Sequence, residues 1–213
     1  MASGKKAKIR KVTPPPTPKQ PKPWDRPPLP AKGDDDERNT FEWVGRALSE
    51  WEHFEAYFGL IFGVLVGAKN ETEPALRAYG SVMTFRGRGD MIRAAADAYF
   101  VKHPHPAQAM LKLLLDEATG FAALRNDIAH GIVQPYSPDG QTIQGSALIP
   151  ARHATKTRKL AKQTSGAPST ITLAYAYGSA ELMAITKEFH LLANRTMGLH
   201  RNMLIALQEK RRP

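Results

Sequence analysis

The residues with the clearest chemical potential lie in one hexapeptide, residues 125–130, with the sequence RNDIAH. A histidine exchanges protons near neutral pH, and an arginine offers a planar fork of donors that fits a phosphate or a carboxylate. Asp127 lies between Arg125 and His130 and is a candidate partner for either, although an aspartate there is more often a solvated helix residue. The hexapeptide therefore combines a proton-transfer group with an anion-binding group.

The hexapeptide ends a helix that we predict to begin near Pro106. Arg125 falls on the inward apolar stripe of this helix, and a guanidinium is rarely buried unpaired, so Arg125 needs a partner, a cleft or an interface. His130 follows at about 140° around the helix axis. The two side chains can share a site only if the helix ends near His130 or a second copy supplies one of them. Gly131 predicts such an end, in the left-handed conformation that glycine favours.

Three other helical regions must support this element. Apolar residues recur at steps of three and four along residues 40–67, which predicts a helix with one buried face. Residues 73–101 are predicted to be a second helical region, and residues 179–209 a last helix that carries several apolar residues. Residues 86–90 hold two glycines within three positions, so we expect a break there, with Asp90 capping the second piece.

Residues 132–176 have a different pattern, typical of a small antiparallel β insert. The turn sequence at 137–140 (SPDG) lies between two candidate strands, 132–136 and 142–148. After a basic loop, residues 170–175 alternate like a third strand. The predicted fold is mainly α, a bundle of four to five helices with this β insert before the last helix.

Residues 1–38 are predicted to be a disordered, basic, proline-rich tail, which leaves residues 39–213 as the helical domain. Nine of the 17 prolines fall between Pro14 and Pro30, and proline lacks the N–H that helices and sheets use. Residues 1–33 carry nine Lys and Arg but one Asp, whereas the remaining 180 residues carry 21 basic and 19 acidic side chains. The tail could bind phosphates or could serve only as a solubilising arm.

The absence of cysteine, of a signal peptide and of a membrane-spanning run indicates in which cellular compartment the protein is expected. The sequence has no cysteine, which excludes disulfides and thiolate metal sites. It shows no signal peptide, and its most apolar run, Tyr57 to Ala68, is shorter than the roughly 20 residues of a membrane span. We therefore expect a cytoplasmic protein without a membrane partner.

The placement of Arg125, Asn126 and His130 at the end of a long helix in a bundle resembles the R-x4-6-H signature of the HEPN superfamily. The helical layout from about Thr40 to Glu209 agrees coarsely with that family. The resemblance implies a metal-independent endoribonuclease that needs no cofactor and works as a homodimer, with two motifs facing each other across the interface. Its products would carry a 2′,3′-cyclic phosphate and a 5′-hydroxyl.

If the resemblance holds, His130 would move protons, Arg125 would stabilise charge on the phosphate, and Asn126 would orient the phosphate or the histidine. The resemblance also implies an RNA partner, a role in toxin, stress or antiviral defence, and a possible antitoxin or regulatory protein. One toxin branch has a regulatory tyrosine two residues after the histidine. That position is Ile132 here, and the nearest tyrosine is Tyr136, so we do not expect that mode of regulation.

Other features leave alternatives open. A basic loop holds five candidate RNA-binding residues, Arg152, Lys156, Arg158, Lys159 and Lys162, and is equally well explained as a solvated loop. His103 and His105 lie between prolines and indicate a linker rather than a metal site. Arg125 and His130 could also be structural residues, and the chain would then be a non-catalytic helical module that binds nucleic acid or a protein partner.

Overall fold

A computed structural model describes residues 20–68, 72–160 and 171–209. In these ranges the chain forms five helices and four short strands. The predicted fold class, mainly α with a small antiparallel insert before the last helix, is confirmed. The helices are α1 (Glu37–Leu65), α2 (Glu73–Ser81), α3 (Phe85–Lys102), α4 (Ala107–His130) and α5 (Ser179–Glu209).

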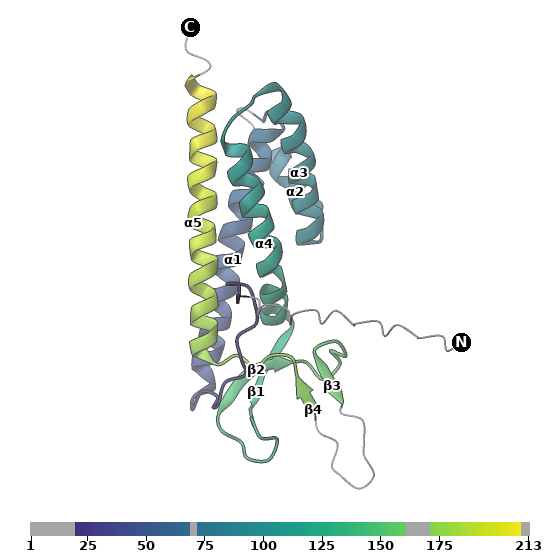
Figure 1. Ribbon diagram of the computed structural model, residues 1–213, viewed down its shortest axis with the longest axis vertical. Helices are drawn as coiled ribbons and strands as arrows, with labels where there is room; N and C mark the ends of the chain where they lie inside the picture. Colours follow the sequence, from purple (N-terminus) through teal and green to yellow (C-terminus); the bar gives the residue numbers. More distant parts are fainter. Residues whose placement is uncertain (1–19, 69–71, 161–170, 210–213) are drawn as a thin grey trace, which may run out of the picture.

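The three longest helices lie side by side along the long axis of the molecule (Figure 1). α1 and α5 run in the same direction, α4 runs in the opposite direction, and α2 and α3 flank the other side of α1 and α4. The strands gather at the end of the bundle where α1 begins and α4 ends. No helix in the described ranges combines the length and the apolar character needed to cross a membrane.

Aromatic side chains from three helices form the centre of the core. The Trp51 ring of α1 contacts Phe54 at 5.0 Å and Phe189 of α5 at 5.1 Å between ring centroids. Phe121 of α4 meets Phe189 edge to face at 5.9 Å. Such edge-to-face pairs add to the burial of apolar area. The predicted inward stripe of the first helix is therefore the core face, except that Phe41, its first residue, is 54% exposed.

The helix break falls at Val82–Thr84, between α2 and α3, and the prediction of a break at residues 86–90 is wrong. Those residues form the first turns of α3, and Thr84 rather than Asp90 caps the helix by accepting a hydrogen bond from the N–H of Gly87 at 3.1 Å. A Cβ at Gly87 would lie 2.8 Å from Val82 Cγ1. Gly87 therefore allows Val82 to approach the first turn of α3 closely, and it does not break the helix.

Gly131 also has a different role from the predicted one. Its φ of −77° and ψ of 166° are extended, so the chain passes from α4 directly into β1 without a left-handed cap. A Cβ at this position would lie 2.7 Å from Leu148 Cγ and 2.9 Å from the Asp127 carbonyl oxygen. The glycine therefore lets the first strand start against the helix and against Leu148.

The strands form two antiparallel pairs. β1 (Gly131–Pro135) pairs with β2 (Ser146–Pro150), and Val133 lies opposite Leu148. β3 (Arg158–Leu160) pairs with β4 (Ile171–Leu173). The hairpin and the strand near residues 170–175 are as expected. The second hairpin strand begins later than predicted, and β3 lies where the sequence indicated only a basic loop.

Residues 20–36, which we call the N-terminal strap, pack on the helical domain although the sequence placed them in a disordered tail. The Trp24 ring meets Phe121 edge to face at 5.7 Å. The Tyr136 hydroxyl donates a hydrogen bond to the Pro30 carbonyl at 2.9 Å, and Asp34 bridges to Ser146 at the edge of β2. Residues 1–19 of the predicted tail lie outside the described ranges.

Candidate functional site

A cleft of about 710 Å³ lies between α1, the start of α3 and the end of α4. Arg125, Asn126 and His130 all line it. The other walls come from residues of α1 around Trp51 and from the segment that includes the α2–α3 linker and the first turns of α3. The structure therefore brings the three residues of the hexapeptide motif to one concave surface within a single chain.

Arg125 and His130 both lie within α4, and they reach the same cleft because it covers a broad stripe of that helix, which also includes Thr119, Ala122 and Asn126. α4 continues to His130 and then stops, because the next residue, Gly131, is extended. Asn126 and His130 are exposed on the cleft, while the Arg125 side chain is only 30% exposed. The helix ends directly after His130, as predicted, but both residues lie within it, so the helix end is not what brings them to one cleft.

Among the described residues, Arg125 has one weak ionic partner. Its Nη2 lies 3.6 Å from Oε1 of Glu52 on α1, and the Glu52 side chain is 64% exposed. An ion pair this long, with a solvated carboxylate, contributes little stability. The Arg125 Nε is shielded from solvent and has no hydrogen-bond partner among the described residues. Because Glu52 reaches only Nη2, and at 3.6 Å, the guanidinium keeps donor capacity for an anionic ligand.

A buried carboxylate fixes the start of α3 against α1. Glu55 is 5% exposed and accepts a hydrogen bond from Trp51 Nε1 at 2.6 Å. Arg88 of α3 pairs with the other oxygen of Glu55 and donates from Nε to the Val82 carbonyl at 2.9 Å. Its guanidinium also lies 5.4 Å from the centre of the Tyr79 ring, and burial raises the pKa of the Tyr79 hydroxyl above its usual value.

The sequence pattern did not predict this network, since Glu55 lies off the apolar stripe of the first helix. The one available signal was its spacing, because Glu55 follows Trp51 by four residues and so lies one helical turn away.

The remaining arginines of the cleft differ in how they are paired. Arg93 lies 3.1 Å from Asp116 and 3.6 Å from Asp90. Arg86 is exposed and forms no ion pair with any residue in the described ranges. The cleft thus contains four arginines, one of which has no carboxylate partner in the part of the chain that the structure describes.

Asp127 is neither a partner of Arg125 or His130 nor a solvated residue, which corrects both expectations. It is 6% exposed and receives two hydrogen bonds from Arg26 of the N-terminal strap, at 2.6 and 2.9 Å. The Tyr177 hydroxyl donates to the same carboxylate at 3.0 Å, and the Tyr175 hydroxyl donates to the Asp127 carbonyl at 3.1 Å. Burial raises the pKa of Tyr175 to about 12 and also raises the pKa of Tyr177 above its usual value, so both hydroxyls stay protonated as donors.

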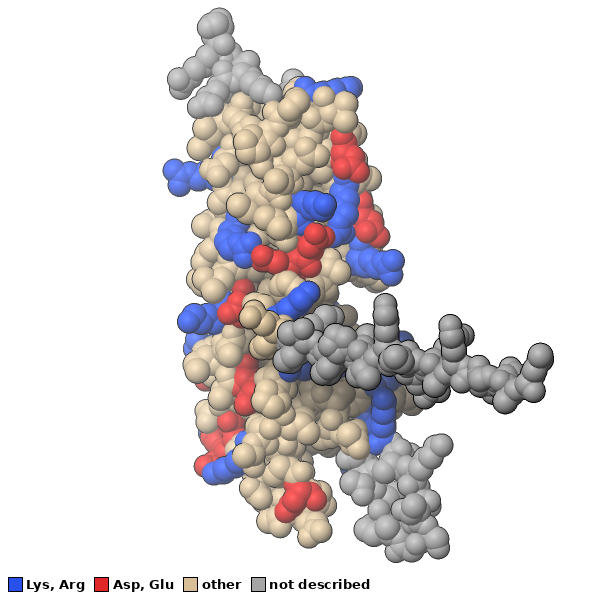
Figure 2. All heavy atoms as spheres, viewed as in Figure 1, with Lys and Arg blue, Asp and Glu red and all other residues tan. Residues whose placement is uncertain are grey.

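The basic loop does not belong to the cleft. Arg152, Lys156, Arg158 and Lys159 lie between β2 and the end of β3, and none of them is among the described residues that line the cleft. Arg158 donates to the Pro150 carbonyl at 3.4 Å, and Lys162 lies outside the described ranges. Figure 2 shows basic and acidic side chains interspersed over the helices on the visible face, as expected for a nearly neutral domain.

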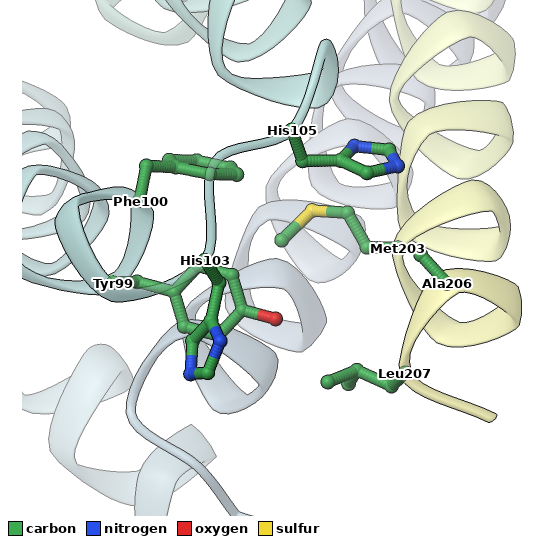
Figure 3. A pocket seen from close by; sticks show the side chains of 7 residues that line it. All are labelled: Tyr99, Phe100, His103, His105, Met203, Ala206 and Leu207. Carbon is green, nitrogen blue, oxygen red and sulfur yellow. The ribbon is translucent and has the colours of Figure 1, made fainter. Parts of the chain in front are cut away.

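His103 and His105 have structural contacts at the opposite end of the bundle, where they line a small cavity with residues of α3 and α5 (Figure 3). The ring of His103 lies 4.9 Å from that of Tyr99. His105 Nδ1 accepts a hydrogen bond from the N–H of Ala107 at 3.0 Å and so supports the start of α4. Within the described ranges, no group of three or more His, Asp or Glu side chains is arranged to hold a metal ion.

Comparison with protein-family models, with curated proteins and with solved structures finds no significant match to this chain.

Proposed function

We propose that this protein is a metal-independent endoribonuclease of the HEPN type. The observation that carries the proposal is that Arg125, Asn126 and His130 line one arginine-rich cleft of about 710 Å³ at the end of α4. A pocket of this volume lies within the range of about 300–1,000 Å³ typical of small-molecule sites, and positive side chains attract the phosphates of RNA.

RNA carries its own nucleophile, the 2′-hydroxyl, so the protein must move protons and stabilise charge. In the proposed reaction His130 accepts the 2′-hydroxyl proton as the 2′-oxygen bonds to the adjacent phosphorus. The bond from phosphorus to the 5′-oxygen then breaks, and that oxygen takes up a proton. Arg125 stabilises the negative charge that accumulates on the phosphoryl oxygens, and Asn126 orients the phosphate. The products are a 2′,3′-cyclic phosphate and a 5′-hydroxyl.

A homodimer fits this scheme. His130 is exposed at the cleft, so a second copy can bring its own His130 to the leaving 5′-oxygen and supply the proton. A cytoplasmic role in toxin, stress or antiviral defence, with an antitoxin or regulatory partner, would follow. Modification of Tyr136 is not part of this proposal, since its side chain is 2% exposed and its hydroxyl is bound to Pro30.

The second candidate is a non-catalytic module that binds nucleic acid or a protein partner through the same cleft. The observation in its favour is the ion pair between Arg125 and Glu52, which already occupies part of the guanidinium. In this case the cleft would bind RNA and leave it intact.

Product analysis separates the two candidates. The full chain is incubated with a mixture of structured and unstructured RNAs in excess EDTA, and the new ends are identified by mass spectrometry. The ribonuclease proposal predicts paired 2′,3′-cyclic phosphate and 5′-hydroxyl ends. RNA that is bound but intact would favour the non-catalytic module, and cleavage that stops in EDTA would contradict the metal-independent mechanism.

A further inference from the structure

Arg86 is the arginine of the cleft whose charge no described carboxylate neutralises. Each of the other three arginines that line the cleft has a glutamate or an aspartate nearby, although for Arg125 the distance is 3.6 Å and the pair is weak. Arg86 belongs to α3, whereas Arg125 and His130 belong to α4. The cleft therefore offers arginines from two different helices, and the one on α4, Arg125, is assigned to the reacting phosphate.

Met83 lines the same cleft as Arg86 and is almost fully exposed. It is 90% exposed, it belongs to the α2–α3 linker three residues before Arg86, and both residues line the cleft. A methionine side chain is flexible and polarisable, and it adapts to flat apolar partners. An inorganic anion would use Arg86 alone, whereas a nucleotide would use both residues, with its phosphate on Arg86 and its base on Met83.

We propose that Met83 and Arg86 form a second nucleotide subsite, next to the one at Arg125 and His130. The ligand is then a single-stranded oligonucleotide with at least two neighbouring phosphates, because a base can pack on Met83 only when it is free of its own stack. The identity of the reacting phosphate rests on the proposed function, but the subsite can be tested by binding alone.

The test measures binding of a short, fluorescein-labelled 2′-O-methyl oligouridylate, which cannot be cleaved because its 2′-oxygen is blocked. Fluorescence anisotropy is recorded over a series of salt concentrations. Arg86→Gln is expected to weaken binding about fivefold or more and to lower the slope of log K against log salt by about 0.7, the value for one lost phosphate contact on a single strand. Met83→Ser is expected to weaken binding with no change in that slope.

Arg77→Gln is the matched control, because Arg77 is an exposed arginine of α2 that pairs with Glu73 and does not line the cleft. It should bind the oligonucleotide like the wild type. Competition by uridine 5′-monophosphate should displace the oligonucleotide from the wild type only at much higher concentration than unlabelled oligouridylate does.

Three results would overturn the subsite. These are equal losses in the Arg86 and Arg77 variants, a wild type that binds the oligonucleotide no tighter than the mononucleotide, or equal affinity for a duplex of the same length. Loss of affinity in Arg86→Gln, together with a wild type that leaves natural RNA intact, would support the subsite and refute the ribonuclease proposal. The two inferences can therefore fail separately.

Discussion

Arg26 and Asp127, 101 residues apart in the sequence, are joined by two hydrogen bonds of 2.6 and 2.9 Å. The pair attaches the N-terminal strap to the last turns of α4, between the residues that face the cleft. Asp127 is nearly fully buried, and its other contacts come from Tyr175 and Tyr177 just before α5. One carboxylate therefore connects the strap, the end of α4 and the chain that leads into α5.

Replacement of Arg26 measures how much its ion pair with Asp127 contributes to the free energy of unfolding. Breaking a fully buried ion pair costs about 3–5 kcal/mol, but Arg26 is 38% exposed, and water can partly solvate Asp127 once the guanidinium is gone. Arg26→Ala should therefore lower the free energy of unfolding by about 1–2 kcal/mol, measured by urea denaturation. Lys32→Ala removes a charge from the same strap but only an exposed pair with Asp35. A loss in Arg26→Ala no larger than in this control would contradict the structural role.

Gly120 tests how Trp24 docks. A Cβ at this position would lie 2.6 Å from the ring of Trp24, so Gly120→Ala should displace the strap. The peptide bond after Trp24 should then be cut faster by chymotrypsin, because a detached segment reaches the protease more often. Gly45→Ala on α1, where a Cβ meets nothing within 4 Å, should leave the cleavage rate unchanged. Equal cleavage rates in wild type and Gly120→Ala would show that Trp24 does not need this space.

The cap of α3 supports the wall of the cleft that carries Arg86 and Arg88. Thr84 accepts the N–H of Gly87 at 3.1 Å, whereas Thr72, at the corresponding position of α2, makes no side-chain cap hydrogen bond. Thr84→Ala should cost about 1 kcal/mol of stability, typical of a lost N-cap. Thr72→Ala should cost clearly less in the same thermal or chemical melt. Equal costs for the two variants would contradict the capping role.

Asp139 in the turn between β1 and β2 should titrate at low pH. Its carboxylate accepts hydrogen bonds from the N–H groups of Thr142 and Gln141 and from the Ser137 hydroxyl, and these lower its pKa from 3.8 to about 2. Since the folded value lies below that of the unfolded chain, the contribution to turn stability is complete above about pH 4 and disappears as the pH falls through 2. A carbon-detected NMR titration of the Asp139 carboxyl gives the midpoint, and a midpoint near 3.8 would contradict these hydrogen bonds.

The helices that follow from local periodicity could be predicted from the sequence. The contacts between segments that are distant in the sequence could not. The stripe of three- and four-residue steps placed the final helix at residues 179–209, and the structure has α5 at Ser179–Glu209. Helix periodicity also placed Arg125 on the inward side of α4. No local pattern could show that Asp127 would meet Arg26 or that Glu55 would meet Arg88, because those partners come together only in the folded chain.

Three predictions that depended on glycine or proline were wrong for a related reason, namely contacts with other side chains. The sequence predicts a helix break at Gly87 and a left-handed helix cap at Gly131, but each glycine instead makes room for a close side chain, Val82 in one case and Leu148 in the other. The prolines of residues 20–36 indicated disorder, but Trp24 and Arg26 among them bind the surface of α4. Proline content indicates only which backbone conformations a segment can adopt. It does not indicate whether side chains such as Trp24 and Arg26 bind another part of the fold.

The most direct test of the central claim measures the rate of RNA cleavage in excess EDTA for wild type, Arg125→Ala and His130→Ala. If the cleft catalyses cleavage as proposed, the rate should fall about 10²–10⁴-fold in His130→Ala and about 10²–10³-fold in Arg125→Ala. These are the usual contributions of a proton-transfer group and of an oxyanion-stabilising group. His153→Ala and Arg201→Ala, exposed residues outside the cleft, should cleave at the wild-type rate. Unchanged cleavage in both cleft variants, or no cleavage of a broad RNA panel by the wild type, would contradict the proposal.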